Sequence, residues 1–191
     1  MASRIRITGG KWRSRLVDVA DARGLRPTPD RVRETLFNWL GQDLTGQSCL
    51  DLFAGSGMLG FEAASRGAER VTLVEQDQTA FSALRQNAQA LGDERLELIR
   101  ADALKFAQSA ASLAVESAQA EKRRGRYNLI FLDPPYHQGW LMRIEPFLPQ
   151  LAAAGARLYV EAEHVVDSLG EWSSVRAGRA GQVYYHLLER P

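Results

Sequence analysis

The sequence has almost no cysteine, and this narrows the kinds of protein it can encode. Its 191 residues include one cysteine, Cys49, so no disulfide can form within the chain. Cys49 lies in a predicted buried strand, where a cysteine is typical as a small hydrophobic side chain. The composition therefore excludes a disulfide-stabilised fold and favours a protein that relies on a hydrophobic core, to which 45% hydrophobic residues contribute.

Long hydrophobic runs are missing as well. No apolar stretch approaches the ~18 residues that a membrane span requires. The first ten residues, MASRIRITGG, do not contain the apolar core of a secretory signal peptide. We therefore expect a cytoplasmic protein that has no membrane partner.

The sequence is also poor in histidine and cysteine, which are typical zinc ligands. It has three histidines, His137, His164 and His186, and their spacing matches no ligand pattern. We expect no metal, and we expect surface or packing roles for these histidines. His137 differs because it follows Tyr136 directly, and we expect it to line a pocket.

Lysine is scarce, and the positive charge is uneven. The net charge is only +1, yet residues 1–33 carry +6, which leaves −5 for the rest. A basic arm on an acidic body favours a polyanionic partner such as nucleic acid. A solvated arginine-rich tail is the alternative. The side chains that we expect to contact phosphates are Arg4, Arg6, Lys11, Arg13, Arg15, Arg26, Arg31 and Arg33.

The N-terminal region predicts a small extension followed by one larger domain. Residues 4–8 and 14–19 alternate in polarity around Gly9-Gly10, which is typical of a β-hairpin. We assign residues 1–24 to this basic hairpin and 25–191 to the main domain. Asp30 is expected to cap a helix over 31–41.

From residue 48 onward the pattern alternates between strands and helices. This alternation predicts a parallel sheet with helices on both faces. Strands are expected at 48–53, 70–75, 95–100, 127–132 and 156–161, and helices at 58–66, 78–91, 103–121 and 139–153. The predicted helix 103–121 is followed by a basic stretch, 122–126. Its cations suit the negative C-terminal end of the helix dipole, and contact with nucleic acid is a second interpretation.

The C-terminal region predicts a change in strand direction. Residues 171–176 and 182–188 read as strands, and the connection between them is too short for a parallel crossover. An antiparallel pair is therefore expected. The whole pattern predicts an α/β, Rossmann-like fold with a seven-stranded, mostly parallel sheet and an antiparallel C-terminal strand.

Residues 51–60, DLFAGSGMLG, contain a match to G-x-G-x-x-G, the dinucleotide fingerprint. Gly55 and Gly57 permit a tight strand-to-helix turn against a flat cofactor, whereas Gly60 is expected to let the helix pack on the sheet. Glu75 ends the next strand, where an acid binds a ribose diol in NAD-binding and methyltransferase folds alike. The glycine pattern alone therefore does not distinguish an NAD-binding protein from a methyltransferase. A turn with a purely structural role is a third interpretation.

Carboxylates favour one of the two cofactors. Asp51, Glu75, Asp102 and Asp133 all lie at or near the carboxyl ends of predicted strands. Four carboxylates in one place are costly unless cationic or donor groups lie among them. They would repel a pyrophosphate, whereas a sulfonium, an amino group and a ribose diol complement them. S-adenosyl-L-methionine is therefore the expected cofactor.

The tetrapeptide Asp133-Pro134-Pro135-Tyr136 follows the predicted strand 127–132 and carries the expected chemistry. Pro134 has no N–H, so the turn presents carbonyl oxygens. The Asp133 carboxylate and a backbone carbonyl can then accept both hydrogens of an exocyclic amine. Tyr136 can stack on the base, a contact worth ~1–3 kcal/mol.

These motifs resemble those of one family, the bacterial small-subunit rRNA guanine-N2 methyltransferases of the RsmD type. The resemblance runs nearly end to end and is carried by IRITGGKWRSR (5–15), LRPTPDRVRETLFNWL (25–40), LDLFAGSG (50–57), VTLVEQD (71–77) and IFLDPPY (130–136). It implies a class I S-adenosylmethionine-dependent methyltransferase that modifies guanine 966 of 16S rRNA. The stretch from about 109 to 125 is longer and richer in alanine than this family leads us to expect.

The resemblance also implies roles for individual residues. Cofactor binding is expected at Asp51, Phe53, Gly55, Ser56, Gly57, Glu75, Gln76, Asp102 and Ala103. Asp133, Pro134, Pro135 and Tyr136 would hold a guanine that is splayed out of the RNA. The helix 31–38 would cover either the cofactor or the RNA entrance.

The implied reaction is direct methyl transfer, and the implied partner is 16S rRNA in the small ribosomal subunit or its assembly intermediate. We expect a monomer. Three alternatives are carried forward: a DNA or other RNA amino-methyltransferase, a nicotinamide oxidoreductase, and an RNA-binding assembly factor without catalysis.

Overall fold

The structure is a computed structural model that describes residues 3–19, 29–118 and 126–191. Arg26 and the basic stretch 122–125 lie outside these residues. The chain divides into two compact units, Met1–Ala101 and Asp102–Pro191, which are described in turn. Within the described part, no helix is long and apolar enough to cross a membrane, and no three metal-ligating side chains form a group that could hold an ion.

The first unit contains three parallel strands in the order β5-β4-β3. Their positions agree with the ranges expected from the sequence, as do the helices that connect them. The elements are β3 (Ser48–Asp51), α2 (Met58–Ser65), β4 (Arg70–Glu75), α3 (Gln78–Leu91) and β5 (Leu96–Arg100). β3 and β4 are buried, Cys49 included, because α2 packs against both.

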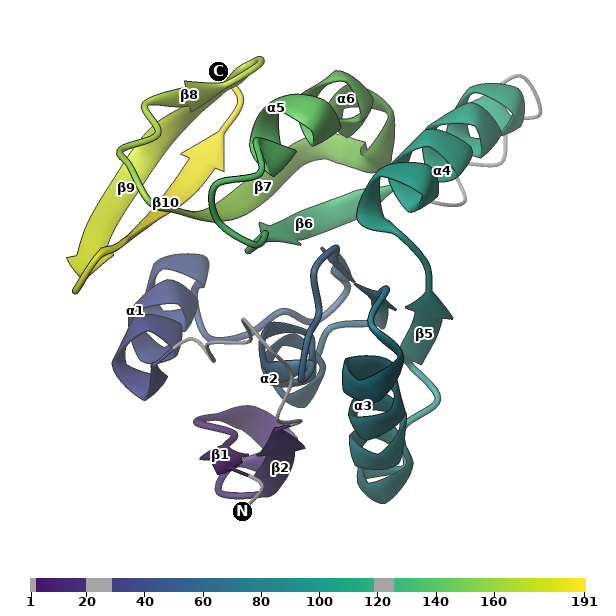
Figure 1. Cartoon of the computed structure of the whole chain (residues 1–191), viewed down its shortest axis with the longest axis vertical. Helices are drawn as coiled ribbons and strands as arrows, with labels where there is room; N and C mark the ends of the chain where they lie inside the picture. The colour runs from purple at the N-terminus through teal and green to yellow at the C-terminus, as the bar shows by residue number, and fades with distance from the viewer. Residues whose placement is uncertain (1–2, 20–28, 119–125) are drawn as a thin grey trace. The chain divides into compact units, whose positions relative to one another are not determined.

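The N-terminal hairpin forms as expected and contacts α2 and α3 within the first unit. The division of the chain after residue 24 stays a prediction, since residues 20–28 lie outside the described part. Strands β1 (Ser3–Arg6) and β2 (Leu16–Val19) pair antiparallel, and a 3-10 turn at Gly10–Trp12 lies between them. Figure 1 shows the hairpin beside α2 and α3. The Ser65 hydroxyl donates to the Gly9 carbonyl and accepts from the Trp12 N–H, which fixes the hairpin on α2.

Helix α1 (Asp30–Leu40) begins one residue earlier than expected. Pro29 stands at the cap position, and Asp30 is the first helical residue rather than the cap. Its carboxylate accepts a hydrogen bond from Arg33 one turn later. A negative side chain in the first turn stabilises a helix through the helix dipole.

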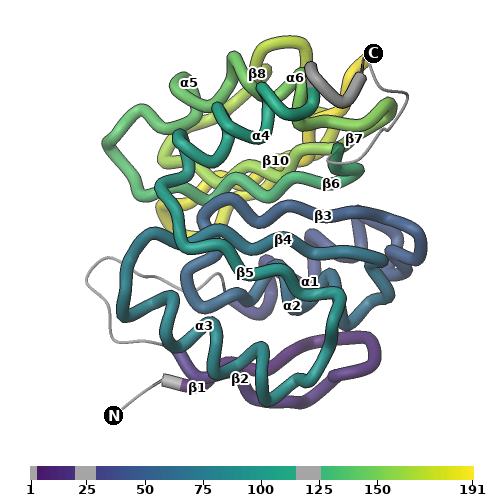
Figure 2. The backbone as a smooth tube through the Cα atoms, turned by 90° about the vertical axis from the view of Figure 1, so that its right-hand side faces the viewer, coloured from purple at the N-terminus to yellow at the C-terminus, as the bar shows by residue number. Residues whose placement is uncertain are grey.

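The second unit contains five neighbouring strands of the larger sheet, in the order β6-β7-β10-β9-β8. Only β6 and β7 are parallel, and each later neighbour is antiparallel. The strands are β6 (Tyr127–Leu132), β7 (Ala152–Ala162), β8 (Ser168–Leu169), β9 (Trp172–Ala180) and β10 (Val183–Glu189). Figure 2 shows α4 (Ala103–Ala118) and the short helices of this unit on one side of β6, β7 and β10.

The expected helix over 139–153 is wrong in its extent. The chain instead forms α5 (Trp140–Ile144), a 3-10 turn at Glu145–Phe147 and α6 (Leu148–Leu151), and β7 begins at Ala152. Pro146 and Pro149 explain the break, because proline lacks the N–H that a continuous helix needs.

The antiparallel C-terminal pair is confirmed, with β10 between β7 and β9. Among the described residues the larger sheet has eight strands rather than the expected seven. The additional strand is β8, two residues long, which pairs with the start of β9. A pairing this short leaves almost no pattern in a sequence.

Candidate functional site

The glycine turn after β3 is held by a carboxylate from the neighbouring strand. Glu75, at the end of β4, accepts the Gly55 N–H at 2.8 Å through Oε2 and the Asp77 N–H at 2.7 Å through Oε1. Gly55 and Gly57 both have positive φ, 53° and 86°, as the expected tight turn requires. Each oxygen of Glu75 keeps a second lone pair, which a hydroxyl of a ligand can use.

Gly57 and Gly60 lie in close contact with neighbouring side chains. A Cβ atom on Gly57 would come within 2.5 Å of both Leu84 and Phe61. A Cβ atom on Gly60 would come within 2.6 Å of Leu73 on β4. Gly60 is therefore a helix-packing glycine, as expected, and the turn has no room for side chains at either position.

Asp51 ends β3 and is almost fully buried. Its Oδ2 accepts the Gly60 N–H at 3.0 Å, so the carboxylate lies at the N-terminus of α2. Negative charge is favourable at a helix N-terminus. The same side chain thus stabilises the helix and places an acid directly before the glycine turn.

The other expected cofactor residues differ in exposure. In the first unit, Phe53 is half-buried, Ser56 is buried and Gln76 is exposed. In the second unit, Asp102 accepts the Lys105 N–H at 3.0 Å and so caps the start of α4, where Ala103 is buried. Asp102 itself is half-buried, so part of the residue is accessible to a ligand.

The Asp133–Tyr136 tetrapeptide extends directly from the end of β6. Asp133 and Tyr136 are half-buried, Pro134 is buried and Pro135 is exposed. His137 follows with φ of 61°, which is unusual for a residue other than glycine. Its ring lies edge-on to Tyr136, with 6.4 Å between the ring centroids.

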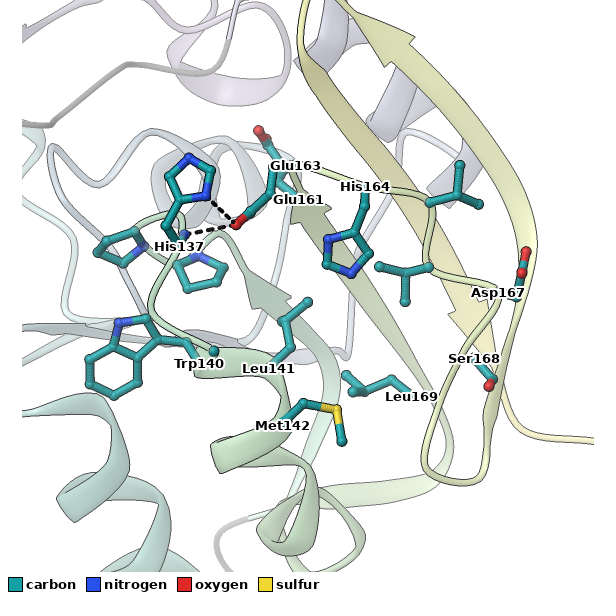
Figure 3. Close-up of a pocket in the computed structure, with 15 residues that line it drawn as sticks. His137, Trp140, Leu141, Met142, Glu161, Glu163, His164, Asp167, Ser168 and Leu169 are labelled. Carbon is teal, nitrogen blue, oxygen red and sulfur yellow. Dashed lines mark hydrogen bonds and ion pairs between the residues drawn. The ribbon is translucent and has the colours of Figure 1, made fainter.

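A cavity of about 260 Å³ lies beside this tetrapeptide, and Figure 3 shows its lining. One side is formed by Pro134, Pro135 and His137, and another by the segment that follows β7. The expectation that His137 lines a pocket holds, but His164 lines the same cavity and was not expected to. His186 is buried instead and accepts the Val166 N–H at 3.2 Å.

Glu163 connects the two sides of this cavity. Its Oε1 accepts the His137 N–H at 2.7 Å and lies 3.2 Å from His137 Nδ1. Burial by itself would raise the pKa of Glu163, but the hydrogen bond from His137 and the nearby His137 and His164 rings bring the pKa below its usual value. The side chain is therefore ionised at neutral pH.

Glu161 contributes a second carboxylate to the cavity, and it is almost fully buried. It accepts the Tyr159 hydroxyl at 2.8 Å. Burial, Glu161 and, more weakly, Asp133 raise the pKa of Tyr159 well above its usual value, so this hydroxyl keeps its proton. Asp133 and Glu161 thus both act on one hydroxyl.

Sequence reasoning missed Glu161, Glu163 and His164. A signal for them exists, since Glu161 and Glu163 lie at the end of a predicted strand, as Asp133 does. Ligands of open α/β sheets bind outside the carboxyl ends of the strands. Extending the search for acids to the strand at 156–161 would have found both.

The expected phosphate contacts divide into exposed and buried side chains. Arg33 is wrong as a phosphate contact in this arrangement, because it is fully buried on α1. It donates to Asp30 and to the Arg6 carbonyl and lies 3.8 Å from the buried Glu62. Desolvation lowers the pKa of Arg33 despite these acids.

The other described side chains that were expected to contact phosphates are exposed. Arg4 pairs with Asp18, and Lys11 lies 3.6 Å from Asp93. Within the described residues no acid pairs with the exposed side chains of Arg6, Arg13, Arg15 and Arg31.

Comparison with known proteins shows similarity along nearly the whole chain. The family model described as Conserved hypothetical protein 95 matches residues 5–189. The chain is 40% identical over 195 residues to Ribosomal RNA small subunit methyltransferase D of Escherichia coli, covering 99% of this chain and 91% of that protein. The chain belongs to this family.

Solved structures agree with the family assignment. A putative methyltransferase from Escherichia coli, yhhF, superposes with a TM-score of 0.81 at 38% identity, covering 98% of each chain. An RNA methyltransferase from Salinibacter ruber, solved in complex with S-adenosyl-L-homocysteine, shares the fold with a TM-score of 0.63 at 17% identity, over 87% of this chain and 94% of that one. The expected family and the Rossmann-like methyltransferase fold are confirmed.

Proposed function

We propose that this chain transfers a methyl group from S-adenosyl-L-methionine to the exocyclic N2 of guanine 966 in 16S rRNA. The observation that carries the proposal is the Asp133–Tyr136 tetrapeptide at the end of β6 in a chain of this family. A methyltransferase named for small-subunit ribosomal RNA, 40% identical over nearly the whole chain, supports the substrate class.

The turn after β3 fits the cofactor. Gly55 and Gly57 supply the positive φ of a tight turn, while Asp51 and Glu75 offer carboxylates to the amino and hydroxyl groups of the ligand. Asp102 is assigned to the adenine amine. When bound, the cofactor supplies an electrophilic methyl group on a positively charged sulfur.

The tetrapeptide positions the attacking nitrogen. Asp133 and the Pro134 carbonyl accept the two N2 hydrogens, and Tyr136 stacks on the base. The N2 lone pair forms the new N–C bond as the C–S bond breaks, which leaves S-adenosyl-L-homocysteine. N2 then carries an extra positive charge and releases one proton to water, while the Asp133 carboxylate stabilises that charge until the proton leaves.

The hairpin is assigned to the RNA backbone. Arg6, Arg13 and Arg15 are exposed and carry positive charge that the described residues do not neutralise. Contacts of this kind hold RNA without reading its sequence and weaken as the salt concentration rises. The substrate places the reaction in the cytoplasm, on the small ribosomal subunit or its assembly intermediate.

Replacing Asp133 tests the chemistry. Asp133→Ala should bind S-adenosyl-L-homocysteine like the wild type in calorimetry but lose at least about 100-fold in methyl transfer, because the amine loses a charged acceptor. The substrate is the small subunit from a strain that lacks this protein. Glu171→Gln, an exposed acid paired with Arg190, serves as the control and should retain activity.

Mass spectrometry tests the substrate. The 16S rRNA of a strain without this protein should lack one N2-methylguanosine, which add-back restores. An unchanged content of N2-methylguanosine would contradict the named substrate, and full activity of Asp133→Ala would contradict the named site. Naked rRNA, an assembly intermediate and mature subunits are compared as substrates in the same assay. The expectation of a monomer stays a prediction for sedimentation velocity.

A further inference from the structure

Glu163 lies at the same edge of the sheet as Asp133. Strands β6 and β7 are parallel neighbours, with Leu132 opposite Val160. Asp133 follows the end of β6, and Glu163 follows the end of β7 directly. Both side chains therefore start from the strand ends where ligands of α/β sheets bind.

The Glu163 carboxylate is held in place through one of its oxygens. Oε1 takes both contacts from His137, the N–H and the ring nitrogen. His137 adopts φ of 61° to make them, a conformation that costs a non-glycine residue ~1–2 kcal/mol. The backbone strain is thus used to fix a carboxylate beside the tetrapeptide.

The carboxylate is also accessible to a ligand. The Glu163 side chain is 32% exposed, and no Lys or Arg of the described residues pairs with it. Glu161, the other carboxylate of the cavity, is buried and accepts the Tyr159 hydroxyl. Of the two acids, Glu163 is therefore the one that presents an ionised oxygen to solvent.

The cavity beside the tetrapeptide is lined by Glu163 and by Pro134 and Pro135, whereas Asp133 and Tyr136 are not among its lining residues. Its volume of about 260 Å³ lies just below the ~300–1,000 Å³ of pockets that hold drug-sized ligands. Pro134 and Pro135 line one side, and Leu141 and Leu169 add apolar surface. A planar aromatic ring with polar edges matches walls of this kind.

We propose that Glu163 determines which base is methylated, by accepting the N1–H of guanine while Asp133 accepts at N2. This inference rests on the proposed function. Guanine presents N1–H and the N2 amine as adjacent donors, and a pair of carboxylates accepts both. Adenine and cytosine place a lone pair beside their amine, which an ionised carboxylate repels. Glu163 therefore selects guanine and rejects the bases that the same tetrapeptide would otherwise accept.

A guanine analogue tests this directly. 2-Aminopurine keeps the 2-amino group, lacks the 6-oxo group, and has a lone pair at N1 in place of the hydrogen, so the Glu163 variants are what assign the preference to N1. Small subunits reconstituted with 16S rRNA that carries either base at the target position are the two substrates. The wild type should prefer guanine by about 100-fold or more in kcat/KM, since the analogue places its N1 lone pair against the Glu163 carboxylate and offers it no donor.

Glu163→Gln should reduce this preference to about 10-fold or less, because its amide N–H₂ can donate to the N1 lone pair of 2-aminopurine. Glu163→Asp, which withdraws the carboxylate from the base, is the second variant and should reduce it too. Glu171→Gln removes an acid elsewhere and should keep the wild-type preference. Calorimetry with S-adenosyl-L-homocysteine confirms that each variant is folded.

The outcomes separate the two proposals. A wild type that methylates both substrates equally overturns the role of Glu163 whatever the variants do. An unchanged preference in a folded Glu163→Gln or Glu163→Asp protein overturns it as well. A wild type that fails to methylate guanine at this position contradicts the proposed function instead.

Discussion

In both units a glutamate carboxylate from one strand holds the turn that follows the neighbouring strand, but the two carboxylates differ in how many of their oxygens are used. In the first, Glu75 at the end of β4 holds the turn after β3 by accepting the Gly55 N–H. In the second, Glu163 after β7 holds the turn after β6 by accepting the His137 N–H. In each, a carboxylate from one parallel strand fixes the backbone that follows its neighbour.

The two carboxylates differ in the number of oxygens that already accept a hydrogen bond. Both oxygens of Glu75 accept backbone N–H groups, and the turn it holds contains glycines that adopt positive φ without strain. Glu163 uses Oε1 alone and holds a histidine in that conformation. Glu75 therefore serves mainly to hold its turn, whereas Glu163 keeps one oxygen that can accept a hydrogen bond from a ligand.

The largest expected effect is on the rigid turn. Gly57→Ala should lower the free energy of unfolding by about 2–5 kcal/mol, because it adds left-handed strain and a clash with Leu84 and Phe61. Gly46→Ala is the matched control, since Gly46 has φ of 76° with open space around it, and it should cost only ~1–2 kcal/mol. Urea unfolding measures both, and equal losses would mean that packing around the turn is unimportant.

The next largest effect is expected on cofactor binding, which should depend on Glu75 and not on Glu163. Glu75→Gln should weaken binding of S-adenosyl-L-homocysteine by about 100-fold, because the variant loses charge-assisted hydrogen bonds to the turn and to the ribose. Glu163→Gln should bind it like the wild type. Isothermal titration calorimetry gives both affinities. If the two variants lose the same affinity, the division of roles between the units is wrong.

A smaller effect is expected in the pH dependence of stability. The folded state lowers the pKa of Glu163 below its usual 4.5, so its ionised form stabilises the fold at pH above that value. This contribution is lost as the pH falls through the lowered pKa. The stability difference between wild type and Glu163→Gln should therefore be at most about 1 kcal/mol at pH 7 and vanish in acid. A difference that grows in acid would reverse the sign of the shift.

The smallest effect is expected at His137. His137→Gly keeps the N–H that Glu163 accepts and removes the backbone strain, while it adds disorder to the unfolded chain. These terms oppose each other, so the free energy of unfolding should change by less than about 1 kcal/mol in urea. A loss of several kcal/mol would show that the imidazole ring, rather than the N–H, holds Glu163.

Much of this arrangement could be predicted from the sequence, because it is local. Asp51, Glu75 and Asp133 end strands whose apolar pattern is clear, and Gly60 follows the turn by a fixed number of residues. The helix broken at Pro146 and Pro149 was also predictable, since proline interrupts a helix wherever it lies.

What could not be predicted depends on contacts between distant segments. The sequence pattern predicts that Arg33 is an exposed basic residue, whereas its burial depends on Glu62 of another helix and on the Arg6 carbonyl of the hairpin. Glu163 gains its role from the register of β7 on β6 and from the conformation of His137, neither of which a local pattern encodes.

The buried contacts of the hairpin have a consequence for the order of events during synthesis. The hairpin is made first, yet Thr8 and Trp12 bind Glu62 and Ser65 on α2, and Asp18 binds Asn87 on α3. While the chain leaves the ribosome, the hairpin must therefore wait for about seventy further residues before its last partner is available. The segment assigned to ribosomal RNA thus cannot complete its contacts until α3 has been made.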